Sequence, residues 1–322
     1  MRFTSFQAGM IAANGVLGKG CSVLSNPKHM VPSLVETGAR LFVTRFLSHF
    51  ISTGCVILLE EGGTMFTFEG TSNKCSLKTV IRVHNPHFYW KVLTEADLGL
   101  ADAYINEDFS FVDKNDGLLN LIMILIANRD FISSNSKLSK KRGWWTPLLF
   151  TAGLTSAKNF FKHALRQNTL TQARRNISRH YDLSNDLFSL FLDETMTYSC
   201  AVFKTEDEDL KDAQQRKISL LIEKVSPVSN NFCKNCSVEH AENIGLHYYQ
   251  TLRHWRKNFL EKQSKILALE FNEKFIRTWE YYFDYCAAGF KSNTLGNYQI
   301  VFSRPGNVAA LGNPYKGFPS AS

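Results

Sequence analysis

Residues 174–204 of the chain read RRNISRHYDLSNDLFSLFLDETMTYSCAVFK, and this stretch predicts both a helix and a candidate site. Ser184, Asn185 and Asp186 offer side-chain oxygens of the kind that cap a helix N-terminus. We therefore expect a short amphipathic helix at this position. The apolar residues that give it one apolar face are Leu187, Phe188, Leu190, Phe191 and Leu192.

A polar and aromatic loop is expected directly after this helix, because Asp193 and Glu194 end the apolar run. Aromatic faces and hydroxyl groups suit a cationic or zwitterionic small ligand. An ordinary helix–loop–helix with a half-buried, inert cysteine fits the same residues, so the loop alone leaves both interpretations open. The loop residues are Thr195, Thr197, Tyr198, Ser199 and Cys200.

Three blocks of the chain carry a family resemblance. Residues 179–203, RHYDLSNDLFSLFLDETMTYSCAVF, resemble a motif of the cyclopropane fatty acid synthases, which use S-adenosylmethionine to methylate double bonds in phospholipid acyl chains. Residues 244–304 resemble the C-terminal end of that family through HYYQTLRHWRKNFLEKQ, FIRTWEYYFDYCAAGF and NYQIVFSR. Residues 38–113, from GARLFVTRFLSHF to AYINEDFSFVD, resemble the N-terminal accessory domain of the plant-type members.

The resemblance implies a chemistry and a set of site residues. It implies S-adenosylmethionine as cofactor, bicarbonate as the bound general base, and methylene transfer to cis double bonds of phospholipid acyl chains. Cys200 and Tyr248 match the family's bicarbonate-binding residues and are the catalytic candidates. Tyr198 and Ser199 match its cofactor contacts.

The resemblance also implies a domain organisation. We expect an α+β N-terminal accessory domain joined to a truncated α/β, Rossmann-like methyltransferase domain. The expected boundaries are a remnant of an upstream domain at 1–32, the accessory domain at 33–130, a basic linker and helix at 131–175, the truncated methyltransferase domain at 176–304, and a flexible tail at 305–322.

The truncation is expected between Lys224 and Val238. In the family, a strand and a glycine-rich turn that holds the cofactor follow at this point, and a glutamate and a histidine of the bicarbonate site come later. Here residues 225–236 read VSPVSNNFCKNC, and roughly one domain's worth of chain is missing. Two hypotheses stay open: a synthase-like enzyme, or a catalytically inactive relative that binds lipid surfaces.

Secondary structure can be predicted for the remaining segments. Four β-prone runs, at 55–61, 64–70, 78–84 and 88–93, favour a small antiparallel sheet, followed by a helix over 95–109. Residues 118–127, LLNLIMILIA, are too few to cross a bilayer and favour a buried helix. Residues 248–269 and 275–290 have helical spacing, 297–306 read as a strand that closes a sheet, and His240, His247 and His254 are expected on a helix face.

The charge pattern points to a surface partner. Residues 131–180 hold Lys and Arg but no Asp or Glu, in a chain of net charge +8. Basic residues beside tryptophans suit an anionic phospholipid surface, and the membrane-surface candidates are Lys140, Lys141, Arg142, Trp144 and Trp145. No nucleic-acid-binding motif accompanies them, so nucleic acid is not an expected partner, while a solvated linker fits almost as well as a membrane contact. A homo-oligomer or a full-length paralogue are further possible partners.

Cysteine usage and the N-terminus bear on location. Seven cysteines without an evident framework favour reduced thiols, and the first residues lack the apolar core of a signal peptide. Cys233 and Cys236 form a CxxC pair without the second pair that a zinc site needs, so no metal is expected. The expected location is cytoplasmic and peripheral to membranes.

Overall fold

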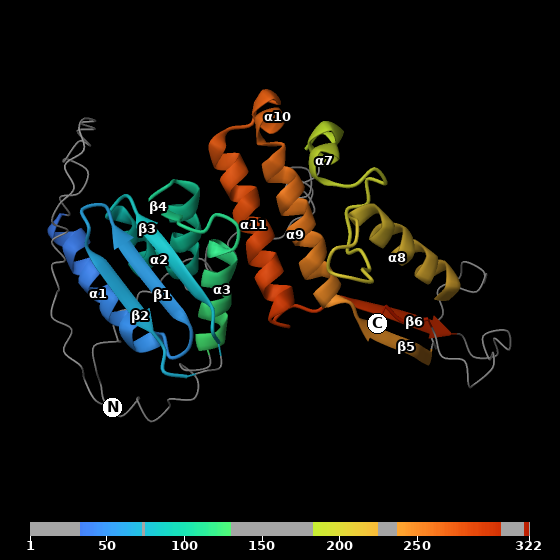
Figure 1. Cartoon of the computed structure of the whole chain (residues 1–322), viewed down its shortest axis with the longest axis horizontal. Coiled ribbons are helices and arrows are strands. Elements are labelled where there is room, and N and C mark those ends of the chain that lie inside the picture. The colour runs from blue at the N-terminus through green and yellow to red at the C-terminus, as the bar shows by residue number, and fades with distance from the viewer. Residues whose placement is uncertain (1–32, 73–74, 130–182, 225–236, 304–318, 322) are drawn as a thin grey trace, which may run out of the picture.

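The computed structural model describes residues 33–72, 75–129, 183–224, 237–303 and 319–321 (Figure 1). We call residues 33–129 the N-terminal part and residues 183–303 the C-terminal part. Both parts mix helices and strands, which agrees with the expected mixture of α and β elements. The expected remnant at 1–32 and the basic linker at 131–175 lie outside the described residues.

A four-stranded sheet forms the centre of the N-terminal part, in the order β2-β1-β3-β4. Helix α1 (Leu34–Phe50) begins with a capping box in which Ser33 and Glu36 bond each other's backbone N–H groups. Strand β1 pairs antiparallel with β2 and parallel with β3, so the prediction of a purely antiparallel sheet was wrong for one pair. The strands are β1 (Cys55–Glu60), β2 (Met65–Glu69), β3 (Lys78–Val83) and β4 (Phe109–Phe111).

Helix α2 (His87–Ile105) replaces the strand predicted at residues 88–93. It starts directly after Pro86, whose φ of −61° suits a helix start. Phe88 and Tyr89 are buried, and the Phe88 ring lies 5.1 Å from that of Phe109 on β4. Packing of these aromatic rings against the sheet outweighs their β-propensity, which is a weak and context-dependent preference.

Helix α3 (Gly117–Asn128) confirms the buried helix predicted at residues 118–127. It packs against β3 on one side and against the C-terminal part on the other. Leu118, Leu119 and Ile124 are almost completely buried. No helix among the described residues is both long and apolar enough to cross a bilayer.

Asn128, the last residue of α3, ties this helix to the start of β1. Its Oδ1 accepts from the backbone N–H groups of Ser52 (2.7 Å) and Thr53 (3.1 Å), and its Nδ2 donates to the carbonyls of Thr53 (2.9 Å) and Ile124 (2.8 Å). The side chain is 1% exposed. One amide therefore satisfies several backbone groups that water does not reach.

We expect Asn128→Ala to lower the free energy of unfolding by about 2–3 kcal/mol, because the substitution leaves buried backbone groups without hydrogen bonds. Urea unfolding followed by circular dichroism measures this change. The matched control is Asn120→Ala on the same helix, where the half-exposed side chain predicts a loss below about 0.5 kcal/mol. Equal losses for the two variants would contradict the role given to Asn128.

The C-terminal part begins with the helix predicted after Ser184. The hydroxyl of Ser184 accepts from the N–H of Leu187 (3.3 Å), which confirms the predicted cap of α7. The remaining elements are α7 (Asn185–Phe191), α8 (Leu210–Lys224), β5 (Ser237–Asn243), α9 (Gly245–Glu261), α10 (Gln263–Ala268), α11 (Glu273–Lys291) and β6 (Tyr298–Ser303).

Strands β5 and β6 form an antiparallel pair and the only sheet described in the C-terminal part. The predicted strand at 297–306 is thus confirmed, although its described partner is β5 alone. His240 lies on β5, so its predicted helix position was wrong, whereas His247 and His254 do lie on α9. The junction at residues 225–236, where the family's cofactor-binding core would be expected, lies outside the described residues.

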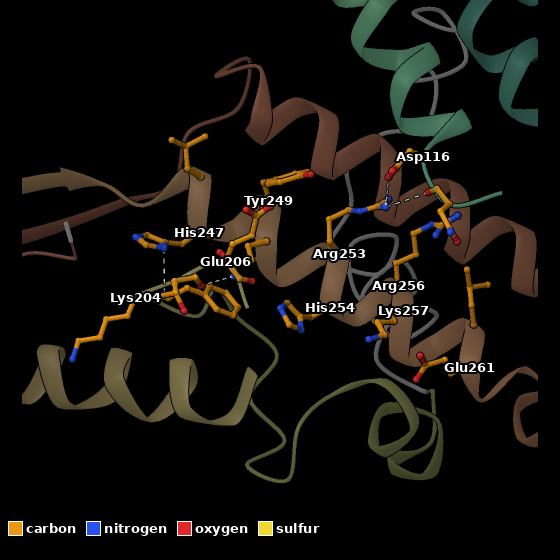
Figure 2. A pocket seen from close by; sticks show the side chains of 16 residues that line it. Asp116, Lys204, Glu206, His247, Tyr249, Arg253, His254, Arg256, Lys257 and Glu261 are labelled. Atoms are coloured by element: carbon orange, nitrogen blue, oxygen red, sulfur yellow. Dashed lines mark hydrogen bonds and ion pairs between the residues drawn. The ribbon is translucent and has the colours of Figure 1, made fainter. Parts of the chain in front are cut away.

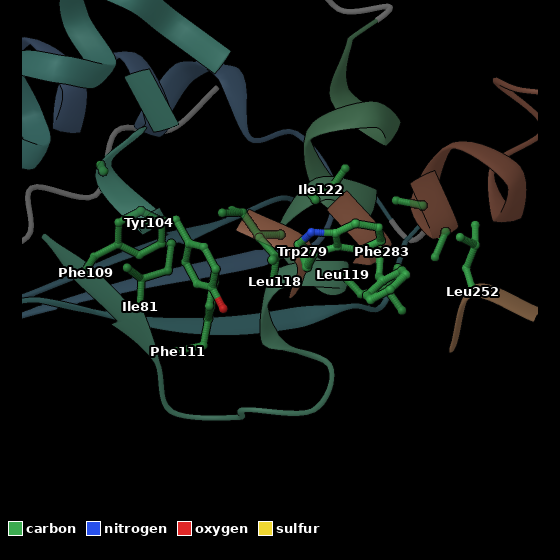
Figure 3. Close-up of a cluster of buried hydrophobic side chains, with 14 of the residues drawn as sticks. Ile81, Tyr104, Phe109, Phe111, Leu118, Leu119, Ile122, Leu252, Trp279 and Phe283 are labelled. Carbon is green, nitrogen blue, oxygen red and sulfur yellow. The ribbon is translucent and has the colours of Figure 1, made fainter. Parts of the chain in front are cut away.

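Helix α11 is the element of the C-terminal part that lies nearest the N-terminal part (Figure 1). It packs against α9 on one side and against α2 and α3 on the other. Figure 3 shows Trp279 and Phe283 of α11 beside Leu118, Leu119 and Ile122 of α3, within one cluster of buried side chains. The two parts therefore share a hydrophobic core.

A buried ionic network reinforces this junction. Asp284 on α11 is fully buried and accepts from Arg253 of α9 (2.6 Å), while the Nε of Arg256 lies 3.0 Å from its other oxygen, too poorly aligned for a hydrogen bond. Arg256 also donates to Glu280 (2.6 Å) and to the carbonyl of Lys114 in the N-terminal part (2.7 Å). The two arginines thus join α9, α11 and the segment before α3.

Candidate functional site

The loop after α7 is held between α8 and α9. Gln214 of α8 donates to the carbonyls of Ser199 (2.8 Å) and Thr197 (3.3 Å). The N–H of Ala201 donates to the hydroxyl of Thr251 on α9 (3.0 Å). These bonds fix the backbone of residues 197–201, so the predicted site loop has a defined conformation.

The two catalytic candidates meet at the start of α9. The thiol of Cys200 donates to the carbonyl of Ile244 (3.6 Å), the residue that precedes α9, and the backbone N–H of Tyr248 donates to the same carbonyl (3.3 Å). The Tyr248 ring packs against Phe290 of α11, with centroids 4.7 Å apart. Residues far apart in the sequence are therefore brought together at one helix start.

Burial determines the state of the Cys200 thiol. Cys200 is 3% exposed, and this burial raises its pKa to about 12, although hydrogen bonds from Asn297 and Thr251 oppose the shift. The thiol is therefore neutral at physiological pH and acts as a weak hydrogen-bond donor rather than as a nucleophile. A neutral, buried thiol of this kind is not suited to covalent catalysis.

The raised pKa predicts slow alkylation of Cys200. At pH 8.5 we expect iodoacetamide to modify Cys200 in the native protein at least ~10²-fold more slowly than in urea, because both thiolate fraction and access fall on burial. Residue-resolved mass spectrometry measures both rates, with the partly exposed Cys75 as internal control. Native labelling of Cys200 as fast as that of Cys75 would disprove its burial.

Tyr198 and Ser199, the predicted cofactor contacts, point toward different elements. The Tyr198 ring lies 5.1 Å from that of Trp255 and 5.3 Å from that of Phe188, and it borders a pocket of about 400 Å³ with Leu192 and Met196. The Ser199 hydroxyl instead accepts from the ammonium of Lys217 on α8 (2.7 Å). The loop therefore offers an apolar pocket on one side and a polar cluster on the other.

A larger groove of about 890 Å³ runs along α9 (Figure 2). The ring of His254 stacks on Phe203 at 5.3 Å, and His247 Nδ1 accepts from the N–H of Phe203 (3.2 Å). Burial lowers the pKa of both histidines, so both are neutral at physiological pH. Figure 2 shows Arg253 directed at Asp116, so its charge in this groove is already paired.

Three site residues escaped the sequence analysis: Gln214, Lys217 and Thr251. The signal for two of them was present in the sequence. Leu210 and Ala213 are buried on α8, and their helical spacing continues through Gln214 and Lys217, so polar residues occupy core positions. A polar residue on the buried face of a helix indicates a partner inside the protein.

Other predicted site residues are not placed by the structure. The membrane-surface candidates Lys140, Lys141, Arg142, Trp144 and Trp145, and the pair Cys233 and Cys236, lie outside the described residues. Within the described ranges no group of three or more His, Cys, Asp or Glu side chains is arranged to hold a metal ion.

Comparison with known proteins connects these segments to one family. A profile of the family described as mycolic acid cyclopropane synthetase matches residues 168–230 and 226–300. These two matches overlap at residues 226–230, before β5, and include the four site residues named above, Tyr198, Ser199, Cys200 and Tyr248.

Individual relatives show the same pattern. Cyclopropane-fatty-acyl-phospholipid synthase of Escherichia coli is 32% identical over 162 residues, which cover 45% of this chain and 33% of the relative. Tuberculostearic acid methyltransferase UfaA1 of Mycobacterium tuberculosis is 50% identical over 70 residues, 20% of this chain and 16% of the relative. Cyclopropane mycolic acid synthase MmaA2 of the same species is 52% identical over 58 residues, 18% of this chain and 20% of the relative. The chain thus spans a third or less of the length of these relatives.

Proposed function

We propose, because residues 168–300 match the cyclopropane synthase family, that this chain is a synthase-like protein that uses S-adenosylmethionine to transfer a methylene group to cis double bonds of phospholipid acyl chains. The observation that carries the proposal is the match of residues 168–300 to the family, together with the contact of the Cys200 thiol with the carbonyl of Ile244 at the start of the helix that bears Tyr248. The N-terminal part would then be the accessory domain, and the C-terminal part a truncated methyltransferase domain.

The described residues fit one end of the cofactor. When bound, S-adenosylmethionine supplies an electrophilic methyl group on a sulfonium ion. Tyr198 offers an aromatic face, which attracts a cation, and Ser199 offers a hydroxyl beside the Lys217 ammonium. In the C-terminal part, as far as the structure describes it, the one sheet is the antiparallel pair β5–β6, with no parallel strand followed by a glycine-rich turn for the adenosine end, so the fit is limited to the amino-acid and sulfonium end.

The roles of the catalytic candidates are the ones that the family resemblance implies. The neutral thiol of Cys200 is a hydrogen-bond donor, and with the Tyr248 hydroxyl it would hold a bicarbonate ion. Cys200 and the three residues that follow it are buried, so water is excluded from the thiol itself. The pocket beside Tyr198 and Met196 supplies an apolar surface next to this loop.

One observation favours the second candidate, a catalytically inactive relative that binds lipid surfaces. The two family matches overlap at residues 226–230, and only residues 225–236 separate α8 from β5, so the chain passes directly from one matched segment to the other. Under this hypothesis the basic residues between 131 and 180 bind an anionic, cytoplasmic phospholipid surface, and a full-length paralogue or a second copy of this chain is the protein partner.

The two candidates are separated by one experiment on the full chain. Radiolabelled S-adenosylmethionine is incubated with the protein and with vesicles of a cis-monounsaturated anionic phospholipid, and acyl methyl esters are analysed by gas chromatography and mass spectrometry. The enzyme proposal expects labelled cyclopropane chains and a loss of roughly 10²-fold in rate for Cys200→Ser or Tyr248→Phe. The control Cys286→Ser, on the half-buried thiol of α11, retains the rate. Folded protein that floats with vesicles but transfers no label would favour the inactive relative.

A further inference from the structure

Lys217 on α8 is buried, and its ammonium group is bonded to neutral side chains. It is 7% exposed, and its ammonium donates to the Ser199 hydroxyl and to Gln214 Oε1, both at 2.7 Å. No carboxylate of the described residues lies within 4.0 Å of it. The cationic charge is therefore buried against neutral groups, an arrangement that costs free energy unless an anion joins it.

Each of the other cationic side chains of α8 has a carboxylate partner. Lys211 pairs with Glu194, Arg216 with Glu208, and Lys224 with Glu242 of β5. Lys224 is as buried as Lys217, at 5% exposure, yet it has a carboxylate partner. Lys217 is thus the exception on α8 within the described chain.

The cluster has donors left for an anion. An ammonium group has three N–H donors, and Lys217 uses two of them on Ser199 and Gln214. The Ser199 hydroxyl accepts from Lys217, which leaves its own proton free to donate. Gln214 is held by two carbonyls of the loop, so it fixes the cluster without competing for the ligand.

The cluster lies just below the surface of the described structure. Ser199 is exposed, so the buried ammonium lies directly beneath a surface side chain. Burial lowers the pKa of Lys217, whereas the nearby Asp193 carboxylate and the Cys200 thiol act in the opposite direction. Asp193 therefore reduces the positive potential, but it is not within ion-pair distance of the ammonium.

We propose that Lys217 and Ser199 together form a binding site for the carboxylate group of a small ligand. The inference rests on the proposed function for the identity of that ligand. Two sources share this chemistry: the amino-acid carboxylate of S-adenosylmethionine and a free bicarbonate ion. A charge-assisted hydrogen bond from an ammonium is the strong form of carboxylate recognition, and here it is preorganised by Gln214.

Calorimetric titration of the full chain distinguishes the two sources. The ligands are S-adenosylmethionine, its decarboxylated analogue and sodium bicarbonate, and the proteins are wild type, Lys217→Met, Lys217→Arg and the control Lys211→Met. If the cofactor is the ligand, wild type and control bind S-adenosylmethionine about 10–100-fold more tightly than the analogue, and Lys217→Met loses this preference while Lys217→Arg keeps part of it. If bicarbonate is the ligand, only its affinity falls in Lys217→Met.

A second measurement needs no variant and no cofactor. Acetylation of wild-type lysines by a succinimidyl ester is followed residue by residue, with sodium acetate as the carboxylate probe and sodium chloride as the salt control. Acetate is expected to slow modification of Lys217 at least about threefold relative to the exposed Lys211 on the same helix. This result keeps the site testable if Lys217→Met fails to fold.

The two proposals fail in different ways. Absence of S-adenosylmethionine binding by wild type would overturn the cofactor claim of the proposed function, and the carboxylate site would then be decided by the bicarbonate and acetate results. Unchanged affinities in Lys217→Met, together with no protection of Lys217 by acetate, would overturn the carboxylate site whatever the fate of the proposed function.

Discussion

Arg256→Met is expected to lower the free energy of unfolding at pH 8 by about 3–5 kcal/mol, the cost of removing one partner of a buried ion pair. Asp284, which is fully buried, and Glu280 would both lose a guanidinium partner. The carbonyl of Lys114 would also lose its donor, so the contact between the two parts of the chain weakens. Urea unfolding of the full chain, followed by circular dichroism, measures the loss.

The matched control is Arg277→Met, which removes another arginine pair across the same junction. Arg277 pairs with Glu107, whose side chain is 66% exposed. Exposed pairs contribute little, so the expected loss is below about 1 kcal/mol. Similar losses for both variants would show that burial of the Arg256 network does not matter for stability.

The same network predicts how the effect depends on pH. Burial raises the pKa of Asp284 to about 6, although Arg256 and Arg253 oppose the shift. A carboxyl whose native pKa is raised binds its proton more tightly in the folded state, so it favours folding below about pH 4, and this contribution is lost as the pH rises through 6. Removing Arg256 raises this pKa further.

The loss caused by Arg256→Met is therefore expected to be smaller at pH 5.5 than at pH 8, by about 1 kcal/mol or more. Unfolding curves of wild type and variant at both pH values give the difference directly. A loss that is constant between pH 5.5 and pH 8 would mean that Asp284 keeps the same protonation state throughout.

Local signals in the sequence predicted many of the elements. The cap at Ser184 and the apolar run of residues 118–127 each correspond to a helix in the structure. They succeeded because capping and helical periodicity act within a few residues. The strand predicted at Phe88 was wrong. Residues 88–93 form a helix whose aromatic side chains pack on the sheet, and local β-propensity carries no information about such a tertiary contact.

The parallel pairing of β1 with β3 could not be predicted from the sequence either. Gly62 and Gly63 turn the chain with positive φ values, so the β1–β2 hairpin was predictable. The next strand can pair with either edge of that hairpin, and only the packing of α3 against β3 distinguishes them. That contact joins segments far apart in the chain and leaves no local pattern.

Some residues of the candidate site were likewise predicted from the sequence, and others were found only in the structure. Tyr198, Ser199 and Cys200 were predicted from one continuous motif, and Tyr248 from another. Gln214, Lys217 and Thr251 hold these loop residues through hydrogen bonds. Those bonds depend on the positions of α8 and α9, which cannot be predicted from the motif. The structure therefore adds the polar cluster that the loop residues alone did not reveal.

The C-terminal part is expected to depend on one aromatic side chain more than on its small sheet. Phe191→Ala should lower the free energy of unfolding by about 3–5 kcal/mol, the usual cost of deleting a buried aromatic ring. Phe191 is completely buried at the end of α7, and the rings of Trp279 and Phe283 on α11 lie 5.4 Å and 5.7 Å away. Denaturant unfolding followed by tryptophan fluorescence measures the loss, because Trp255 and Trp279 both face this ring.

The control for Phe191→Ala is Phe302→Ala on β6, where the side chain is 59% exposed and a loss below about 0.5 kcal/mol is expected. Phe191 also contacts the ring of Tyr198, so the cavity left by the substitution reaches the site loop. Alkylation of Cys200 should therefore accelerate in Phe191→Ala and stay slow in Phe302→Ala. If Phe191→Ala unfolds like wild type, α7 is not packed on α9 and α11 in solution, and the aromatic cluster does not hold the site loop in place.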